Sequence, residues 1–136
     1  MVEDFNPRRY RVAVLAGGKS GEREVSLASG EGALKALEQA GFNGVLLDPA
    51  EKEDLKRLMD EPFDVAFLCL HGKWGEDGTM QGFLDLIGLP YTCSGVWSSA
   101  LAMDKSQSKC YYRDEGIPTP SAIAVRAGDQ MDADEV

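Results

Sequence analysis

The chain has 136 residues, with 14 Lys or Arg against 23 Asp or Glu, and its formal net charge is −9. The length suits one ordinary domain, and 43% hydrophobic with 27% charged residues indicates a folded globular protein rather than a disordered one. The acidic surplus argues against a nucleic-acid-binding protein, because binding a phosphate backbone requires an excess of Lys and Arg. The composition does not argue against binding of small phosphate-bearing molecules, since loop amides and single lysines can bind them.

Three short apolar runs predict buried strands, at 11–16, 44–47 and 65–70. Each run is continuous rather than alternating, which is typical of strands covered on both faces of a parallel sheet.

Helical patterns separate these strands. They are expected at 26–40, with Ser26 or Ser29 as the N-cap, at 50–59, and at 79–87, before a brief extended segment at 89–92. The alternation of strands and helices predicts an α/β fold, a parallel doubly wound sheet with helices on both faces.

The pattern changes beyond Gly95. One long helix is predicted at 96–113, and Pro118 and Pro120 then enforce an extended chain that leads into a strand at 121–126. We therefore expect a first domain at 1–95 and the beginning of a second at 96–136.

Cysteine usage indicates a reducing compartment. Cys69, Cys93 and Cys110 are widely spaced, and His71 is the only histidine, so no metal site is expected. The first residues lack the pattern of a signal peptide, and the longest apolar run is far below the ~20 residues that span a bilayer. These observations predict a cytoplasmic protein without membrane contact.

A glycine-rich loop follows the first strand, at 17–26. Gly18-Lys19-Ser20 matches the end of a P-loop, but Ala13 stands where that motif needs a glycine, so the motif is not satisfied. The loop carries Glu22 and another acid just before a helix. These carboxylates either offset the helix dipole, by ~0.3–1 kcal/mol, or one of them faces the cleft and holds a positively charged group of a substrate.

A second loop, at 71–78, follows the third strand and contains three glycines. In open α/β sheets, ligands bind outside the carboxyl ends of the strands, so His71 and its polar neighbours form a candidate recognition surface. Alternatively, Glu76 and Asp77 only cap the next helix, and Trp74 only packs against a neighbour. Lys105 and Lys109 share one helix face, which is ordinarily a solvated face.

Taken together, these segments resemble the D-alanine–D-alanine ligase family of ATP-grasp enzymes. The resemblance covers roughly residues 10–126. Its motifs lie in order along the chain, at 17–30, 71–82, 88–96, 99–105 and 116–120.

The resemblance implies an enzyme that joins two D-alanines with ATP, through an acyl phosphate, for peptidoglycan precursors. Glu22 resembles the glutamate that binds the ammonium of the first D-alanine, and His71 the histidine that lines its pocket; both are the implied catalytic residues. Val25 and Ser26 resemble residues that shape this pocket. Lys105 resembles a lysine that reaches the ATP phosphates.

The resemblance also implies what this chain lacks. Family members are more than twice as long, require Mg²⁺ or Mn²⁺, and commonly form homodimers through the region seen here. Only the N-terminal Rossmann-like, pre-ATP-grasp domain and a truncated start of the ATP-grasp domain match, so we expect the chain alone to be inactive and to bind no cofactor tightly. Cys93 departs from the family pattern, which usually has glycine there.

Two alternatives remain open at this stage. One is a non-catalytic module that binds a ligand or partner through the same loops. The other is a related ligase that makes D-alanine–D-lactate or D-alanine–D-serine.

Overall fold

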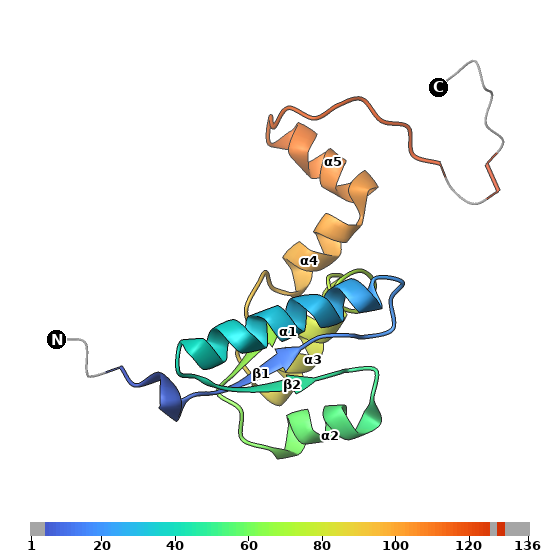
Figure 1. Cartoon of the computed structure of the whole chain (residues 1–136). Helices are drawn as coiled ribbons and strands as arrows, with labels where there is room; N and C mark the ends of the chain where they lie inside the picture. Colours follow the sequence, from blue (N-terminus) through green and yellow to red (C-terminus); the bar gives the residue numbers. More distant parts are fainter. Residues whose placement is uncertain (1–4, 126–127, 130–136) are drawn as a thin grey trace.

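The structure is a computed structural model that describes residues 5–125 and 128–129. Within them, three parallel strands form a sheet in the order β2-β1-β3. The strands are β1 (Arg11–Leu15), β2 (Asn43–Leu47) and β3 (Val65–Leu68). A parallel bridge from Ala66 to Tyr91 lies in the segment predicted to be extended. The predicted parallel α/β architecture is therefore confirmed (Figure 1).

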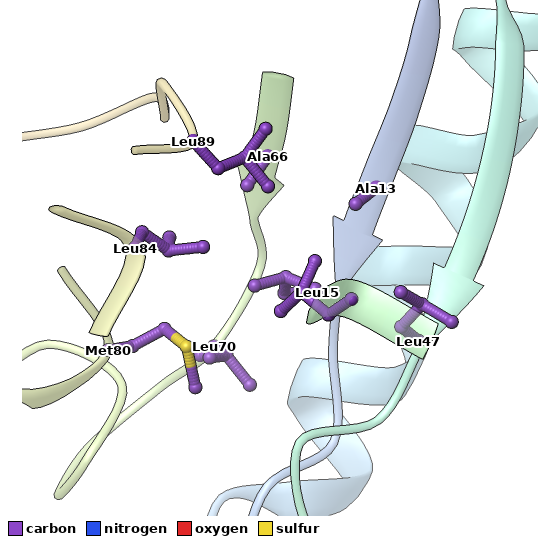
Figure 2. Close-up of a cluster of buried hydrophobic side chains, with 9 residues drawn as sticks. Ala13, Leu15, Leu47, Ala66, Leu70, Met80, Leu84 and Leu89 are labelled. Atoms are coloured by element: carbon purple, nitrogen blue, oxygen red, sulfur yellow. The ribbon is translucent and has the colours of Figure 1, made fainter. Parts of the chain in front are cut away.

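The central strand β1 sends alternate side chains to two separate cores. Ala13 and Leu15 belong to a cluster with Leu58 of α2 (Lys52–Asp60) and Leu84 of α3 (Thr79–Ile87). Figure 2 shows Leu15 between the side chains of Leu84 and Leu47. The even-numbered residues of β1 face the opposite cluster, which includes Leu34 of α1 (Arg23–Gln39). Helices therefore cover both faces of the sheet, as a buried central strand requires.

The start of α1 differs from the prediction. The helix begins at Arg23 with Glu22 as its N-cap, so neither Ser26 nor Ser29 caps it. Ser26 lies inside the helix with 0% exposure. Its hydroxyl does not cap the helix, because it bonds to backbone groups outside the helix. The second helix likewise spans Lys52–Asp60 rather than 50–59. The third, at Thr79–Ile87, has the predicted bounds and ends at Gly88, whose φ is +71°.

The long helix predicted at 96–113 is two helices, α4 (Val96–Met103) and α5 (Lys105–Asp114). Asp104 separates them with φ −93° and ψ 93°, and its carboxylate accepts hydrogen bonds from the backbone N–H groups of Ser106 and Gln107. A side chain that caps a new helix competes with continuation of the old one. The strand predicted at 121–126 is wrong for 121–125, which have no strand pairing, and Arg126 lies outside the described residues.

The remaining described elements lie at the ends of the chain. A short 3-10 helix, η1 (Pro7–Arg9), precedes β1, and α5 projects away from the sheet (Figure 1). No described helix combines the length and the apolar character that crossing a membrane requires.

Candidate functional site

The glycine-rich loops meet at one edge of the sheet, because the carboxyl ends of parallel strands share an edge. The loop after β1 is joined to the loop after β3 by the Ser20 hydroxyl, which donates to the His71 carbonyl at 2.7 Å. It is joined to the loop after β2 by the Gly18 N–H, which donates to Asp48 Oδ1 at 2.9 Å. The structure thus brings together two loops that are about 50 residues apart in sequence.

Glu22 stands at the junction of α1 and the loop after β3. It is exposed and occupies the N-cap position of α1, but its side chain makes no hydrogen bond to the helix. Its Oε2 lies 2.7 Å from the position that a Cβ on Gly72 would occupy, and Gly72 has φ +70°. The positive φ favours glycine at this position. The carboxylate therefore lies against the His71–Gly72 backbone and is open to solvent.

His71 is held between α1 and its own loop. Its side chain is 32% exposed, its Nε2 lies 3.2 Å from Ser29 Oγ, and its Nδ1 lies 3.8 Å from Glu76 Oε1. The other oxygen of Glu76 accepts the Gly72 N–H at 2.7 Å, which ties the start of the loop to its middle.

Ser26 holds the backbone beneath the two loops. It is fully buried, and its hydroxyl accepts the Gly17 N–H at 2.8 Å and donates to the Cys69 carbonyl at 2.7 Å. One side chain thus links the ends of β1 and β3 to α1. Val25, its neighbour, is 60% exposed on the helix surface.

An ion pair fixes the glycine loop on its other side. Arg23 pairs with Asp48 at 2.5 Å and donates to the Gly18 carbonyl at 2.8 Å. Burial by itself raises the pKa of the Asp48 carboxyl, but hydrogen bonds from Arg23, Gly18 and Ala50 outweigh burial and hold this pKa below its ordinary value. The carboxylate therefore stays charged while it organises the loop.

The loop after β3 has a fixed internal structure. Trp74 adopts φ +69°, rare for a non-glycine residue, and Asp77 accepts its N–H at 2.9 Å and that of Thr79 at 3.1 Å. Burial raises the pKa of Asp77, but these hydrogen bonds prevail and lower it overall. The N-cap of α3 is Gly78, so Asp77 bonds to the first helical residue without being the cap.

Two pockets flank His71. One, of about 270 Å³, lies on the side of α2 and α3 and is lined by Lys19, Trp74 and mainly apolar side chains. The other, of about 370 Å³, lies against α4 and includes Glu76 and Gln81. The buried Oε1 of Gln81 has no hydrogen-bond partner among the described residues, although its Nε2 donates to the Gly75 carbonyl.

Lys105 and Cys93, also singled out in the sequence, take no part in these hydrogen bonds, although Cys93 lines the second pocket. Lys105, the first residue of α5, is exposed and lines neither pocket. Cys93 is exposed with φ +79°, the left-handed region that glycine enters most easily, which suits the glycine that the family resemblance implies at this position. Within residues 5–125 and 128–129, no group of three or more His, Cys, Asp or Glu side chains could hold a metal ion.

Comparison with known proteins connects this geometry to a family. Residues 48–94 match the family model described as the N-terminus of D-ala D-ala ligase. A D-alanine–D-alanine ligase of Delftia acidovorans is 56% identical over 110 residues, which cover 81% of this chain and 33% of that relative. The chain belongs to the D-alanine–D-alanine ligase family. It spans about a third of the length of the curated ligases that it matches, corresponding to their N-terminal part.

Solved ligase structures share the fold. The D-alanine–D-alanine ligase of Bacillus anthracis complexed with ATP superposes with a TM-score of 0.81 at 40% identity, over 93% of this chain and 43% of that one. The D-alanyl-alanine synthetase A of Vibrio cholerae superposes with a TM-score of 0.70 at 30% identity, over 80% of this chain and 38% of that one. The family resemblance identified from the loop motifs is confirmed.

Sequence reasoning missed two residues that organise this ligase N-terminal region. Asp48 follows β2 at the same sheet edge as the glycine loops, so its place directly after a strand could have marked it as a site residue. Ser29 was considered only as a helix cap, whereas its hydroxyl lies beside His71. That contact joins segments 42 residues apart and has no local sequence signature.

Proposed function

We propose that this chain is the D-alanine-binding N-terminal part of a D-alanine–D-alanine ligase. One observation carries the proposal: the exposed Glu22 carboxylate lies against the His71–Gly72 backbone at the carboxyl edge of the sheet. An exposed carboxylate beside a polar loop suits the ammonium group of an amino acid, because a charge-assisted hydrogen bond is roughly twice as strong as a neutral one.

In this proposal, Glu22 binds the ammonium of the first D-alanine and His71 lines its pocket. Val25 shapes the pocket from the helix surface, and Ser26 holds the supporting backbone. Lys105 belongs to the start of the ATP-binding part, at 96–136, where an exposed ammonium can neutralise phosphate charge.

The whole ligase would phosphorylate the carboxylate of the first D-alanine with ATP, releasing ADP. The amine of the second D-alanine would then attack the acyl phosphate and displace inorganic phosphate. Mg²⁺ or Mn²⁺ would accompany ATP, and we assign no residue of this chain to the metal. Pairing of two copies through 1–95, a cytoplasmic location and a role in peptidoglycan synthesis belong to the same proposal.

The binding step can be tested on the chain itself by following its backbone amide signals by NMR during titration with D-alanine. We expect shifts around Glu22 and Gly72, with a dissociation constant on the order of millimolar, since a few contacts supply only about 4 kcal/mol. L-alanine should bind more weakly. Absence of D-alanine-dependent shifts at these residues would overturn the proposal, while binding without stereoselectivity would favour a non-catalytic binding module.

Two acids in the same helical turn offer a matched comparison. Glu22→Gln should weaken D-alanine binding by about tenfold or more, because it removes the charge that faces the ammonium. Glu24→Gln removes a charge from the first turn of α1 and should leave binding nearly unchanged. Equal effects would mean that only the net charge matters.

Catalysis is expected to require more than these 136 residues, since the matched relatives are more than twice as long. The chain with ATP, Mg²⁺ and D-alanine should release no phosphate beyond the background without D-alanine. D-alanine-dependent phosphate release would contradict this part of the proposal.

A further inference from the structure

We propose that Ser29 is a positioning residue for His71: its hydroxyl accepts the Nε2 proton of the imidazole and leaves Nδ1 as the nitrogen that faces Glu76 and the loop. The position of the ring proton does not depend on the proposed function. Only its effect on D-alanine binding rests on that function.

The direction of the hydrogen bond follows from counting protons. A serine hydroxyl has one proton to donate and two lone pairs. The Ser29 hydroxyl donates to the Val25 carbonyl one turn earlier in α1, at 2.9 Å. A serine inside a helix commonly makes this bond to the residue four positions before it. The Val25 carbonyl is the nearer acceptor for the single Ser29 proton, so we assign Ser29 Oγ as the acceptor toward His71 Nε2, 3.2 Å away, with the proton on Nε2.

The other ring nitrogen makes no hydrogen bond to Glu76. Nδ1 lies 3.8 Å from Glu76 Oε1, which is beyond hydrogen-bond distance, so this contact places no proton on Nδ1 and the Ser29 contact carries the assignment. The His71 backbone is held independently by Ser20, which donates to its carbonyl at 2.7 Å. The ring is thus fixed at Nε2 by α1, and the main chain is fixed by the glycine loop.

The same face of α1 supplies the supporting contacts. Glu22, Ser26 and Ser29 lie four and then three residues apart, the spacing that places side chains on one side of a helix. The Glu22 carboxylate lies beside Gly72. The Ser26 hydroxyl donates to the Cys69 carbonyl, and the Ser29 hydroxyl contacts the His71 ring. This side of α1 is therefore a continuous support for residues 69–72.

A functional consequence follows if the site binds D-alanine as proposed. With Nε2 engaged by Ser29, only Nδ1 can exchange a hydrogen bond with a substrate. Loss of the Ser29 hydroxyl would free the ring to rotate and to carry its proton on either nitrogen. Since the hydrogen bond made by one imidazole nitrogen sets which nitrogen is protonated, Ser29 would decide which nitrogen acts.

The test is unusually direct, because His71 is the only histidine in the chain. Imidazole ¹H–¹⁵N correlation spectra of the ¹⁵N-labelled protein report which nitrogen is protonated and whether its proton exchanges slowly enough to be seen. We expect the neutral ring of the wild type to show a one-bond Nε2–H correlation and an unprotonated Nδ1.

Three variants separate the contact from general effects on folding. Ser29→Ala should lose the Nε2–H correlation through faster exchange with water, and Ser29→Thr, which keeps the hydroxyl, should retain it. Ser106→Ala removes an exposed serine from α5 and should leave the spectrum of the ring unchanged. Thermal melts and the amide spectrum verify that each variant is folded.

Two results would overturn the assignment. One is a wild-type ring protonated on Nδ1, which needs no variant to be decisive. The other is an Nε2–H correlation that persists unchanged in folded Ser29→Ala. Neither measurement uses D-alanine, so failure of the proposed substrate binding would leave this result standing, and the reverse also holds.

Discussion

Two glycines in α1 should respond in opposite directions to the same substitution. Gly30 is buried against Ala16, the residue that follows β1, and Leu46 of β2, whereas Gly32 is exposed and has nothing within 4 Å of an added Cβ. An alanine in a helix interior is favoured over glycine by about 0.8–1 kcal/mol. Gly32→Ala should therefore stabilise the protein by about 0.5–1 kcal/mol.

At Gly30 the same gain is outweighed by a clash. A Cβ there would lie 2.3 Å from the Cβ of Ala16 and 3.0 Å from Leu46 Cδ1. Carbon atoms in contact are about 3.5–4.0 Å apart, so α1 must retreat from the sheet by about 1 Å. Overpacking of this kind costs about 1–3 kcal/mol, and separation of α1 from β1 adds lost apolar contact. We expect Gly30→Ala to destabilise the protein by about 1–2 kcal/mol after the helix gain.

Urea unfolding followed by circular dichroism measures both variants in one experiment. The two substitutions share the helix, the chemistry and the change in the unfolded chain, so the difference in unfolding free energy isolates the contact with Ala16 and Leu46. We expect this difference to be about 1.5–3 kcal/mol, with similar m-values. Equal stabilisation by both variants would refute the claim that Gly30 sets the distance between α1 and the sheet.

Three further outcomes are expected. Ser26→Ala leaves the buried Gly17 N–H and the Cys69 carbonyl without their hydrogen-bond partner. The variant should therefore lower the unfolding free energy by about 2–4 kcal/mol, although alanine has the better helix propensity. A loss below about 0.5 kcal/mol would exclude the bridging role of Ser26. Because its hydrogen bonds lower the pKa of Asp48, this carboxylate contributes stability above the ordinary aspartate pKa, and that contribution disappears as pH falls through the lowered pKa. Asp48→Asn should therefore be less stable than wild type at pH 6 and show a smaller loss toward pH 3 in urea titrations; parallel curves would contradict this. Cys69 is buried, and burial raises the pKa of its thiol, so iodoacetamide should label the two exposed cysteines first, as mass spectrometry after limited reaction can show.

Local patterns were sufficient for the three strands and the three helices of the first 90 residues, though not for where the first two helices begin. Continuous apolar runs predicted all three strands, because a strand buried on both faces needs no polar alternation. The helix at Thr79–Ile87 was predicted with correct bounds, since a terminal glycine can adopt the left-handed conformation that ends a helix. The errors arose where a side chain had two competing partners: Ser26 bonds across the fold rather than capping, and Asp104 caps a new helix.

The sequence by itself determined the fold class, the family and the two loops that carry Glu22 and His71, because strand runs and motif order are properties of the chain alone. Tertiary structure decided how those loops meet: Glu22 against Gly72, Asp48 under the glycine loop, and Ser29 beside the imidazole. Each of these contacts joins segments 30 to 50 residues apart. They depend on the register of a parallel sheet and on the closeness of α1 to β1, and no local pattern of residues encodes either distance.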